Sequence, residues 1–399
     1  MPAPSSSPSA LLRAATTAKV PARRRSVVES STLLQALEAV PDPRQRRGRR
    51  HRLQSVLYLA LGAVLAGADS WAAIADWAAV SDQDPVMGRP PHASTIRRLL
   101  GRVDVAALEA ALTGWVMGRR DASAAPAAAA NAPLAERRVV LAADGKTLRG
   151  SSRPDGLQTK LVSVYDHASH LVLTQTPVVE GDEIAAFTTA LAALPDLHEA
   201  VITADALHCQ REHATWLRER GGHYLFTVKA NQPRLRRAVA ALPWGQVPGF
   251  RRRQVGHGRT ESRSIKVLDL DGHPMQALFP HVQRAIKVVR RRRCRRTGKQ
   301  SVETVYAVTS LDYRHADPGL LAVWIQGHWG IENRVHHVRD VTQSEDRSRI
   351  RAGSGPHVLA ALRNTALNLH RLDGHTNIAS AQRRTAWRAG AALQTINAA

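Results

Sequence analysis

The sequence predicts an α/β fold in which helices flank a mixed β-sheet, preceded by an N-terminal helical domain. Residues 29–118 carry apolar side chains at helical spacing. After residue 138, short apolar runs typical of buried strands alternate with helical segments. Between about residues 240 and 300, β-like runs among arginines break this alternation. We therefore expect a β-rich insertion before the helix that is expected over residues 318–338.

The N-terminal part begins with a segment that is not expected to fold. Residues 1–28 are rich in Ala, Ser and Pro and contain no acidic residue, which predicts a disordered basic tail. The helical domain follows, with helices expected over Leu33–Val40 and Leu53–Ala66. The apolar run from Leu53 to Ala68 is too short to span a bilayer and is expected to form a buried helix.

One basic segment of the helical domain is a candidate DNA contact. After Pro90-Pro91, the pair Ser94-Thr95 can cap a helix that carries Arg97 and Arg98. A short helix, a turn and a capped helix with arginines is compatible with a helix-turn-helix unit, and Arg97 and Arg98 are its candidate DNA-binding residues. An ordinary bundle with a solvated basic face explains the same pattern, so both interpretations remain open.

The rest of the chain divides into a linker, a sheet domain and a tail. The Ala-rich residues 119–135 predict a linker, the sheet domain is expected at 136–371, and residues 372–399 are expected to be loose. Expected strands cover residues 139–143, 161–165, 171–179, 201–204, 224–228 and 305–309, and expected helices cover 183–194, 209–220, 318–338 and 356–371.

The composition indicates a polyanionic partner. There are 56 Lys and Arg against 33 Asp and Glu, a formal net charge of +23, and such an excess favours binding to nucleic acid. The two cysteines are far apart and form no metal-ligand pattern, which fits a reducing cytosol. No secretion signal is visible in residues 1–28. We expect a cytoplasmic, nucleoid-associated bacterial protein with no membrane contact.

Three acidic residues are candidates for metal chemistry. Asp144 and Asp205 each follow an expected buried strand, and Glu332 lies in the expected helix 318–338. A carboxylate beside a buried strand is costly unless it is neutralised, and a hard divalent ion prefers oxygen ligands. Gly145 could let a phosphate or ion approach closely. Taken singly, each Asp could instead cap a turn, and Glu332 could be a solvated helical residue.

The sequences around these acids carry a family resemblance. The chain resembles the DDE transposases of H-repeat-associated, ISAs-type insertion sequences from about residue 33 to 371. The segments that carry the resemblance are Ala143-Asp-Gly-Lys-Thr-Leu-Arg-Gly150, Thr203-Ala-Asp-Ala-Leu-His-Cys-Gln210, Tyr224 to Gln232, His257-Gly-Arg-Thr-Glu261, His328-Trp-Gly-Ile-Glu-Asn333 and Asp340-Val-Thr with Glu345 to Arg351.

The resemblance implies an RNase H-like catalytic fold and a DNA transposase. Asp144, Asp205 and Glu332 match its catalytic, metal-binding acids, and the expected cofactor is two Mg²⁺ or Mn²⁺ ions. The expected partners are the terminal inverted repeats and target DNA, with a homodimer in the DNA complex. Two alternatives are a transposase-derived DNA-binding protein without catalysis and a metal-dependent nuclease without strand transfer.

Several further residues are expected to contact DNA. Related transposases often place Tyr, Arg and Lys around the third acid, where this chain has Ile325, His328 and Arg339, so that only Arg339 keeps its charge. A protonated His328 or Arg334 could substitute. Lys229, Asn231 and Gln232 could hold a phosphate or a flipped base, or form a polar turn. The full set of expected DNA-binding residues near the acids is Lys146, Arg149, Lys229, Asn231, Gln232, His328, Arg334 and Arg339.

Other assignments around the third acid stay open. Glu345 and Asp346 are rival third acids, although the motif match favours Glu332. Trp329 could stack on a base or pack against the sheet. The basic run Arg290–Arg296 is expected to be a solvated loop that adds nonspecific DNA affinity.

Overall fold

The computed structural model describes residues 32–47, 49–81, 90–123, 138–153, 155–256, 258–388 and 390–399. The expected basic tail, residues 1–28, and residues 124–135 of the expected linker lie outside this part of the chain. His257, within one of the family motifs, also lies outside it. Residues 119–123, expected to begin the linker, instead continue a long helix.

The N-terminal part is helical, as expected. Its helices are α1 (Leu33–Glu38), α2 (Leu53–Leu65), α3 (Trp71–Val80), α4 (Ala93–Leu100) and α5 (Val105–Ser123). The hydroxyl of Thr32 accepts from the Gln35 N–H, and the Gln35 side chain accepts from the Thr32 N–H, which closes a capping box at α1. Helix α2 is buried on almost every side, which explains its mainly apolar sequence.

Helix α4 begins at Ala93, before the Ser94-Thr95 pair that the sequence suggests as its cap. The ring Nδ1 of His92 accepts from the Ser94 N–H, so His92 is the cap, and the expected cap by Ser94-Thr95 is wrong. Arg97 and Arg98 are exposed on this helix. Among the described helices, none has both the length and the apolar character needed to cross a membrane.

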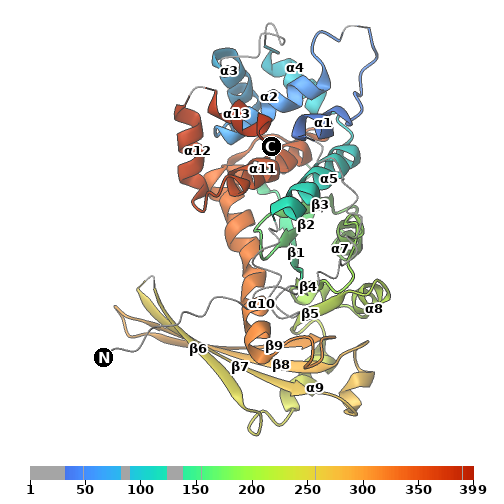
Figure 1. The fold of residues 1–399 in the computed structure, drawn as a ribbon, viewed down its shortest axis with the longest axis vertical. Helices are drawn as coiled ribbons and strands as arrows, with labels where there is room; N and C mark the ends of the chain where they lie inside the picture. The colour runs from blue at the N-terminus through green and yellow to red at the C-terminus, as the bar shows by residue number, and fades with distance from the viewer. Residues whose placement is uncertain are drawn as a thin grey trace, which may run out of the picture.

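A mixed sheet forms the second part of the molecule and confirms the predicted fold class (Figure 1). In the described residues it has nine strands in the order β3-β2-β1-β4-β5-β9-β8-β7-β6. Strands β1, β4 and β5 are parallel, whereas β2, β3 and β9 run antiparallel to their neighbours, as in an RNase H-like sheet. The strands are β1 (Val140–Thr147), β2 (Lys160–Asp166), β3 (Val172–Pro177), β4 (Val201–Ala204), β5 (His223–Val228), β6 (Gly249–Gly256), β7 (Arg259–Asp269), β8 (Arg284–Cys294) and β9 (Gln300–Thr309).

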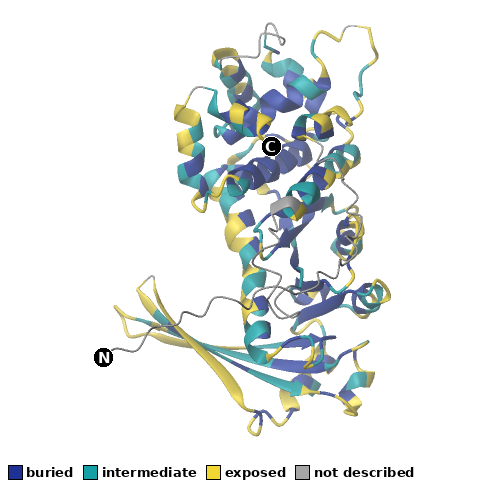
Figure 2. Cartoon of the chain, in the orientation of Figure 1, coloured by how far each residue is buried: buried dark blue, intermediate teal, exposed yellow. Residues whose placement is uncertain are grey.

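The expected β-rich insertion extends this sheet rather than forming a separate unit. Strands β6, β7 and β8 add to β9 as a continuous antiparallel ladder. Arg290 to Arg293 lie in β8, so the expectation of a solvated loop there is wrong. The far part of the ladder projects from the body, and β6 is exposed along its whole length (Figure 2).

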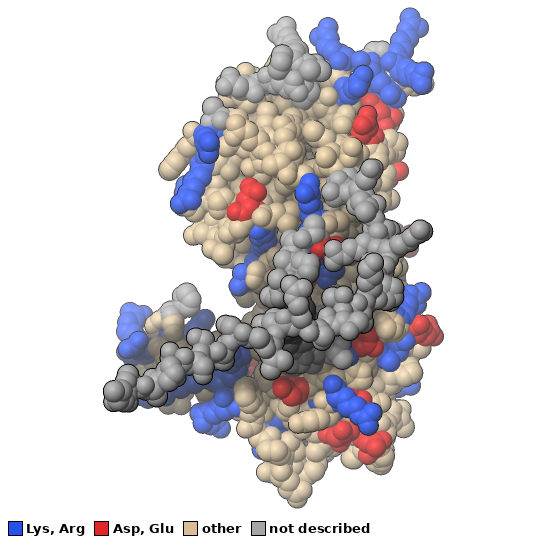
Figure 3. Space-filling model, viewed as in Figure 1, with Lys and Arg blue, Asp and Glu red and all other residues tan. Residues whose placement is uncertain are grey.

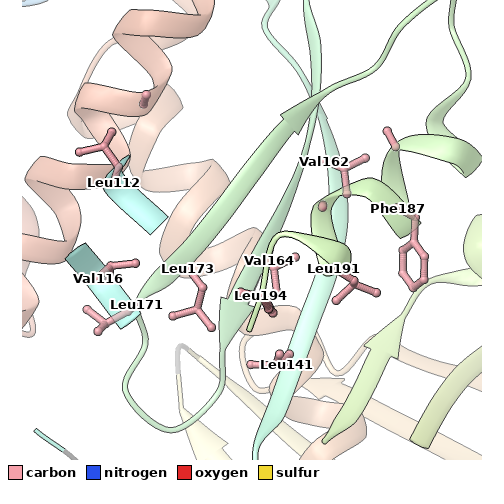
Figure 4. Packing of buried hydrophobic residues seen from close by; sticks show 14 of the residues in the cluster. Leu112, Val116, Leu141, Val162, Val164, Leu171, Leu173, Phe187, Leu191 and Leu194 are labelled. Carbon is pink, nitrogen blue, oxygen red and sulfur yellow. The ribbon is translucent and has the colours of Figure 1, made fainter. Parts of the chain in front are cut away.

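Helices cover both faces of the sheet core. Leu141, Val162 and Val164 of the sheet share a buried cluster with residues of α7 (Glu183–Ala192), and Leu173 of β3 with Leu112 of α5 (Figure 4). On the other face, α10 (Pro318–Gly330) packs Leu321 and Trp324 into a second cluster. The remaining α8 (Arg211–Glu219) and α9 (Pro233–Ala241) lie beside β5 and β9.

The C-terminal part is ordered, so the expectation of a loose tail is wrong. Helix α11 (Gly355–Leu372) is buried from Gly355 to His370 between the sheet and the N-terminal helices. Two more helices follow, α12 (Ile378–Trp387) and α13 (Ala391–Asn397), and Leu393 and Ile396 are buried. The side chain of Asn368 bonds both backbone groups of Val172, which satisfies part of the edge strand β3.

Helix α10 continues beyond Gly330 with two stretches of wider, π-helical turns, Ile331–His336 and Val338–Thr342. A buried ion network holds this extension. The guanidinium of Arg339 donates two hydrogen bonds to Glu345, at 2.8 and 3.0 Å, and Arg363 of α11 donates to the same carboxylate at 3.1 Å. All three residues are at most 2% exposed. The network therefore ties the α10 extension to α11.

Removing the acid of this network should destabilise the fold. Because Glu345→Gln leaves two buried guanidinium groups without their carboxylate, we expect the free energy of unfolding to fall by about 3–5 kcal/mol, measured by urea denaturation. The matched control is Glu303→Gln, since the Glu303 side chain is 52% exposed and 3.9 Å from Arg292. That control should change stability by less than about 1 kcal/mol. Equal effects of the two variants would contradict the role of the network.

Candidate active site

Two of the three candidate acids lie on neighbouring parallel strands. Strands β1 and β4 pair with Ala143 opposite Ala204, so Asp144 and Asp205 occupy the next position on each side. Strand β4 ends there, but β1 continues to Thr147 because it stays paired with β2, where Asp144 lies opposite Ser163. Asp144 therefore lies inside a strand, not after one as the sequence suggested.

The third acid approaches from the helix that crosses the sheet. Glu332 lies in the first wide turn after α10. One ligand atom each from Asp144, Glu332 and His336 fall within 4.8 Å of one another. The ring Nδ1 of His336 is 3.0 Å from Glu332 Oε2 and 3.5 Å from Asp144 Oδ2. The structure thus places the first and third acids together, although their catalytic role stays a prediction.

Asp205 belongs to this site through its charge and its backbone position. Its Oδ1 accepts from the Leu207 N–H at 2.9 Å and caps a short 3₁₀ turn, Ala206–His208. The turn-cap interpretation of this residue is therefore also satisfied. Asp205 is outside the group of ligand atoms formed by Asp144, Glu332 and His336. A cation between the strands would have to draw the Asp205 carboxylate toward that group.

Electrostatics make the cluster a fit for a cation. Burial, together with the nearby charges of Asp205, Glu332 and Glu183, raises the pKa of Asp144 to about 7. The hydrogen bond from His336 is the main cause that lowers the pKa of Glu332. Carboxylates that repel one another in a partly buried site are the oxygen donors that a hard divalent ion prefers. The residues therefore fit a divalent metal.

Two residues near the candidate acids, His336 and Glu183, were missed by sequence reasoning. His336 follows Glu332 by four positions, a spacing that places both on one helix face and could have indicated it. Glu183, the first residue of α7, comes from a segment with no signal of its own. Its carboxylate fills the space beside Gly145, where an added Cβ would overlap it. The open approach expected at Gly145 is thus taken by this side chain.

Two expected DNA contacts are instead internal ion pairs. Lys146 is buried, and its Nζ is 2.6 Å from Asp340 Oδ1. Arg339 is fully buried and bound to Glu345. Neither cation can reach a phosphate on the surface, so both DNA-binding predictions are wrong. The sequence pattern could not show that the partners Asp340 and Glu345 fold back onto them.

His328 does not supply the positive charge that the family pattern requires. Its Nδ1 is 3.1 Å from the Thr203 hydroxyl, and burial lowers its pKa to about 4. The ring is therefore neutral at neutral pH, and the expected substitution by a protonated His328 is wrong. Arg334, two residues after Glu332, is exposed and remains available. Arg149 is also exposed, with its side chain 3.5 Å from Asp346.

The polar segment after β5 supports the loop of the second acid. The side-chain amide of Gln232 donates to the Cys209 carbonyl at 2.9 Å, and that of Asn231 donates to the Ala206 carbonyl. These bonds hold the turn that follows Asp205 and favour a positioning role over the expected phosphate or base contact. Lys229, at the end of the same strand, is exposed.

The contacts of Glu345, Asp346 and Trp329 bear on the alternatives left open near the third acid. The carboxylate of Glu345 is occupied by two arginines, which makes it unsuitable as a third acid. Asp346 is instead 3.5 Å from Arg149. Trp329 is 47% exposed, and the guanidinium carbon of Arg290 lies 4.9 Å from its ring centre. This cation–π contact links α10 to β8.

Replacing Asp144 should stabilise the metal-free protein at high pH. Between about pH 4 and pH 7 the carboxyl ionises in the unfolded chain but not in the folded one, so stability falls as pH rises. A protein with Asn at this position does not lose stability in this way, because Asn does not ionise. We expect Asp144→Asn to be more stable by about 1–3 kcal/mol at pH 8 in a chelator, with the gain fading toward pH 4.

Urea denaturation across this pH range measures the effect. The control is Asp271→Asn, in an exposed turn, which should show no such pH-dependent gain. A wild-type protein that is as stable as Asp144→Asn at pH 8 would contradict the assignment of a disfavoured charge at this position.

The comparisons with known proteins agree with this geometry. Residues 34–116 match the model of the DDE_Tnp_1-associated domain, and residues 135–369, more than half of the chain, match that of the transposase DDE domain. The chain is 29% identical over 364 residues to "Putative transposase YncI" of Escherichia coli O157:H7, covering 85% of this chain and 87% of that one. It is 28% identical over 362 residues to "H repeat-associated putative transposase YhhI" of Escherichia coli K12, covering 86% and 91%.

A solved structure also matches at low similarity. It is a piggyBac transposase synaptic complex with hairpin DNA, with a TM-score of 0.38 and 11% identity over 89% of this chain and 83% of that one. The family matches, by contrast, extend over both the helical part and the sheet. The chain belongs to the transposase DDE domain family.

Proposed function

We propose that this chain is the transposase of an insertion sequence. It would bind the terminal inverted repeats, cleave a phosphodiester bond at the element end, and join the freed 3′-OH to target DNA. The observation that supports this proposal is that Glu332 lies beside Asp144, while Asp205 occupies the matching position on the neighbouring parallel strand, in a family of DDE transposases. Membership of the family makes the chain a DDE-type, metal-dependent enzyme.

The acids would hold two Mg²⁺ or Mn²⁺ ions. Such ions, when bound, supply an activated water and stabilise charge on the attacking and leaving oxygens. The chain's own residues prepare this site. The His336 hydrogen bond orients the Glu332 carboxylate, and Asn231 and Gln232 fix the loop that carries Asp205. Both features keep oxygen donors in place before DNA binds.

The DNA path is expected along the projecting ribbon of β6, β7 and β8. Arg251, Arg252 and Arg253 of β6 are exposed, and so are Arg291 and Arg293 of β8, which is separated from β6 by β7. Figure 3 shows the basic side chains gathered on this part of the molecule. Exposed Arg97 and Arg98 of α4 offer a second basic surface on the helical part. We propose that the two surfaces contact different parts of the element end.

The partner and cellular proposals follow from the reaction. Two element ends must be joined, which requires two active sites, so we propose a homodimer assembled on DNA. We further propose that the protein acts at the bacterial nucleoid.

The catalytically inactive alternative, a transposase-derived DNA-binding protein, is favoured by one observation: neither Arg339 nor His328 offers a surface cation beside Glu332. A nuclease without strand transfer is a third outcome of the same assay.

Replacing the second acid tests the proposed chemistry. Purified protein with Mg²⁺ and element-end DNA should yield cleaved and strand-transfer products. Because Asn supplies no negative charge to a cation, Asp205→Asn should lower the cleavage rate by about 10³-fold while keeping DNA affinity. Wild-type cleavage by this variant would refute the assigned role. Cleavage without joined products would indicate a nuclease, and binding without cleavage by wild type would indicate the inactive alternative.

Removing arginines from the ribbon tests the DNA path. Each phosphate contact releases counterions, so Arg251→Ser/Arg253→Ser should weaken DNA binding and reduce the slope of log K against log salt by about 2. Fluorescence anisotropy over a salt series measures this slope. The matched control is Arg220→Ser/Arg314→Ser. These two exposed arginines precede β5 and follow β9, at the edge of the sheet away from the candidate acids. An unchanged slope for the ribbon variant would exclude this path.

A further inference from the structure

A fourth carboxylate lies against the first strand of the candidate site. Glu183 begins α7, and the carboxylate of the preceding Asp182 already caps that helix by accepting from the Ala185 N–H. Glu183 is therefore free of the capping role. Its side chain reaches across to β1, where a Cβ added at Gly145 would overlap Oε1 and lie 3.1 Å from Oε2. The carboxylate thus lies on the backbone directly beside Asp144.

The turn that follows Asp205 carries a histidine, His208, that lies near the Glu183 carboxylate. His208 lies three residues after Asp205, in the turn that Asp205 caps. Its Nε2 is 3.7 Å from Glu183 Oε1. The ring is fully buried, and among the described residues neither of its nitrogens has a hydrogen-bond partner. A buried imidazole directed at Glu183 restricts where this carboxylate can lie.

The glycine in β1 explains how the carboxylate gains this position. Glycine inside a strand weakens it and often marks the close approach of another group. At Gly145 the approaching group is the Glu183 side chain, and the three nearest atoms that an added Cβ would meet all belong to that side chain. Because Gly145 has no side chain, the Glu183 carboxylate can occupy the space next to Asp144. Gathering like charges in this way is unfavourable unless a cation shares them.

We propose that Glu183 is a fourth carboxylate ligand of the divalent-metal centre, next to Asp144 and Asp205, with His208 as the residue that positions it. This inference rests on the proposed function. A fourth oxygen donor increases the negative charge and the number of ligands available to a hard cation. The alternative is a helix-end glutamate that only favours the positive end of the α7 dipole. That role needs no contact with β1 and would leave metal affinity unchanged.

Metal binding to the full chain without DNA separates the two roles. Mn²⁺ titrations followed by calorimetry should show that Glu183→Gln binds Mn²⁺ about ten-fold more weakly than wild type or worse. Glu183→Asp keeps a carboxylate and should recover part of the affinity. The matched control is Glu180→Gln, an exposed glutamate three residues earlier, which should bind Mn²⁺ like wild type.

A substitution at Gly145 tests the position of the Glu183 carboxylate without changing Glu183. In Gly145→Ala the new methyl displaces the Glu183 side chain, so Mn²⁺ affinity should fall while Glu183 itself is unchanged. The double variant Gly145→Ala/Glu183→Gln should bind no more weakly than Glu183→Gln, because both changes remove one interaction. Thermal unfolding of each variant without metal checks that the fold is kept.

The outcomes distinguish this inference from the function on which it rests. If Glu183→Gln binds Mn²⁺ within about two-fold of wild type while Asp144→Asn loses binding, Glu183 is not a ligand and the proposed function stands. Additive losses in the double variant would also overturn the shared contact. If wild type binds no Mn²⁺, or Asp144→Asn binds it unchanged, the proposed metal centre fails together with this inference.

Discussion

The position of Glu332 depends on the buried ion pairs that fasten the extension of α10 to the rest of the molecule. Arg339 and Asp340 follow Glu332 on the same helical extension, and both are paired. Arg339 bonds to Glu345, and Asp340 bonds to Lys146 of β1, two residues after Asp144. The extension is therefore held to the strand that carries the first acid. A shift of these pairs would move Glu332 relative to Asp144, since both lie on the connected elements.

The same network joins the sheet to the helical part. Arg363, which shares the Glu345 carboxylate, lies in α11, and α11 is buried between the N-terminal helices and β3. Chain segments from both ends of the sequence thus complete one helical unit on top of the sheet (Figure 1). A buried ion pair is a weak source of net stability compared with apolar packing. Its effect here is to fix one arrangement of α10, α11 and β1.

The candidate acids lie in a partly buried region, whereas many of the arginines lie on an exposed surface. The acids collect where the sheet and α10 partly exclude water, and burial and then mutual repulsion raise the pKa of Asp144. Exposed arginines lie along β6, which is exposed throughout, and along the projecting ends of β7 and β8. A polyanion is attracted to the exposed basic surface, whereas a small cation is attracted to the acidic one. Trp329 and Arg290 connect the two regions by direct contact.

The sequence by itself indicated most of the elements, the family and three candidate acids. Apolar runs such as Val201–Ala204 and the buried α2 can be recognised because burial on most sides leaves few polar positions. It did not determine which cations are free. Lys146 and Arg339 look like surface residues along the chain, and only the fold brings Asp340 and Glu345 to them. The tertiary structure alone also placed His336 and Glu183 beside Asp144, and turned the expected tail into α12 and α13. Those decisions depend on contacts between distant segments, which local propensity and spacing do not encode.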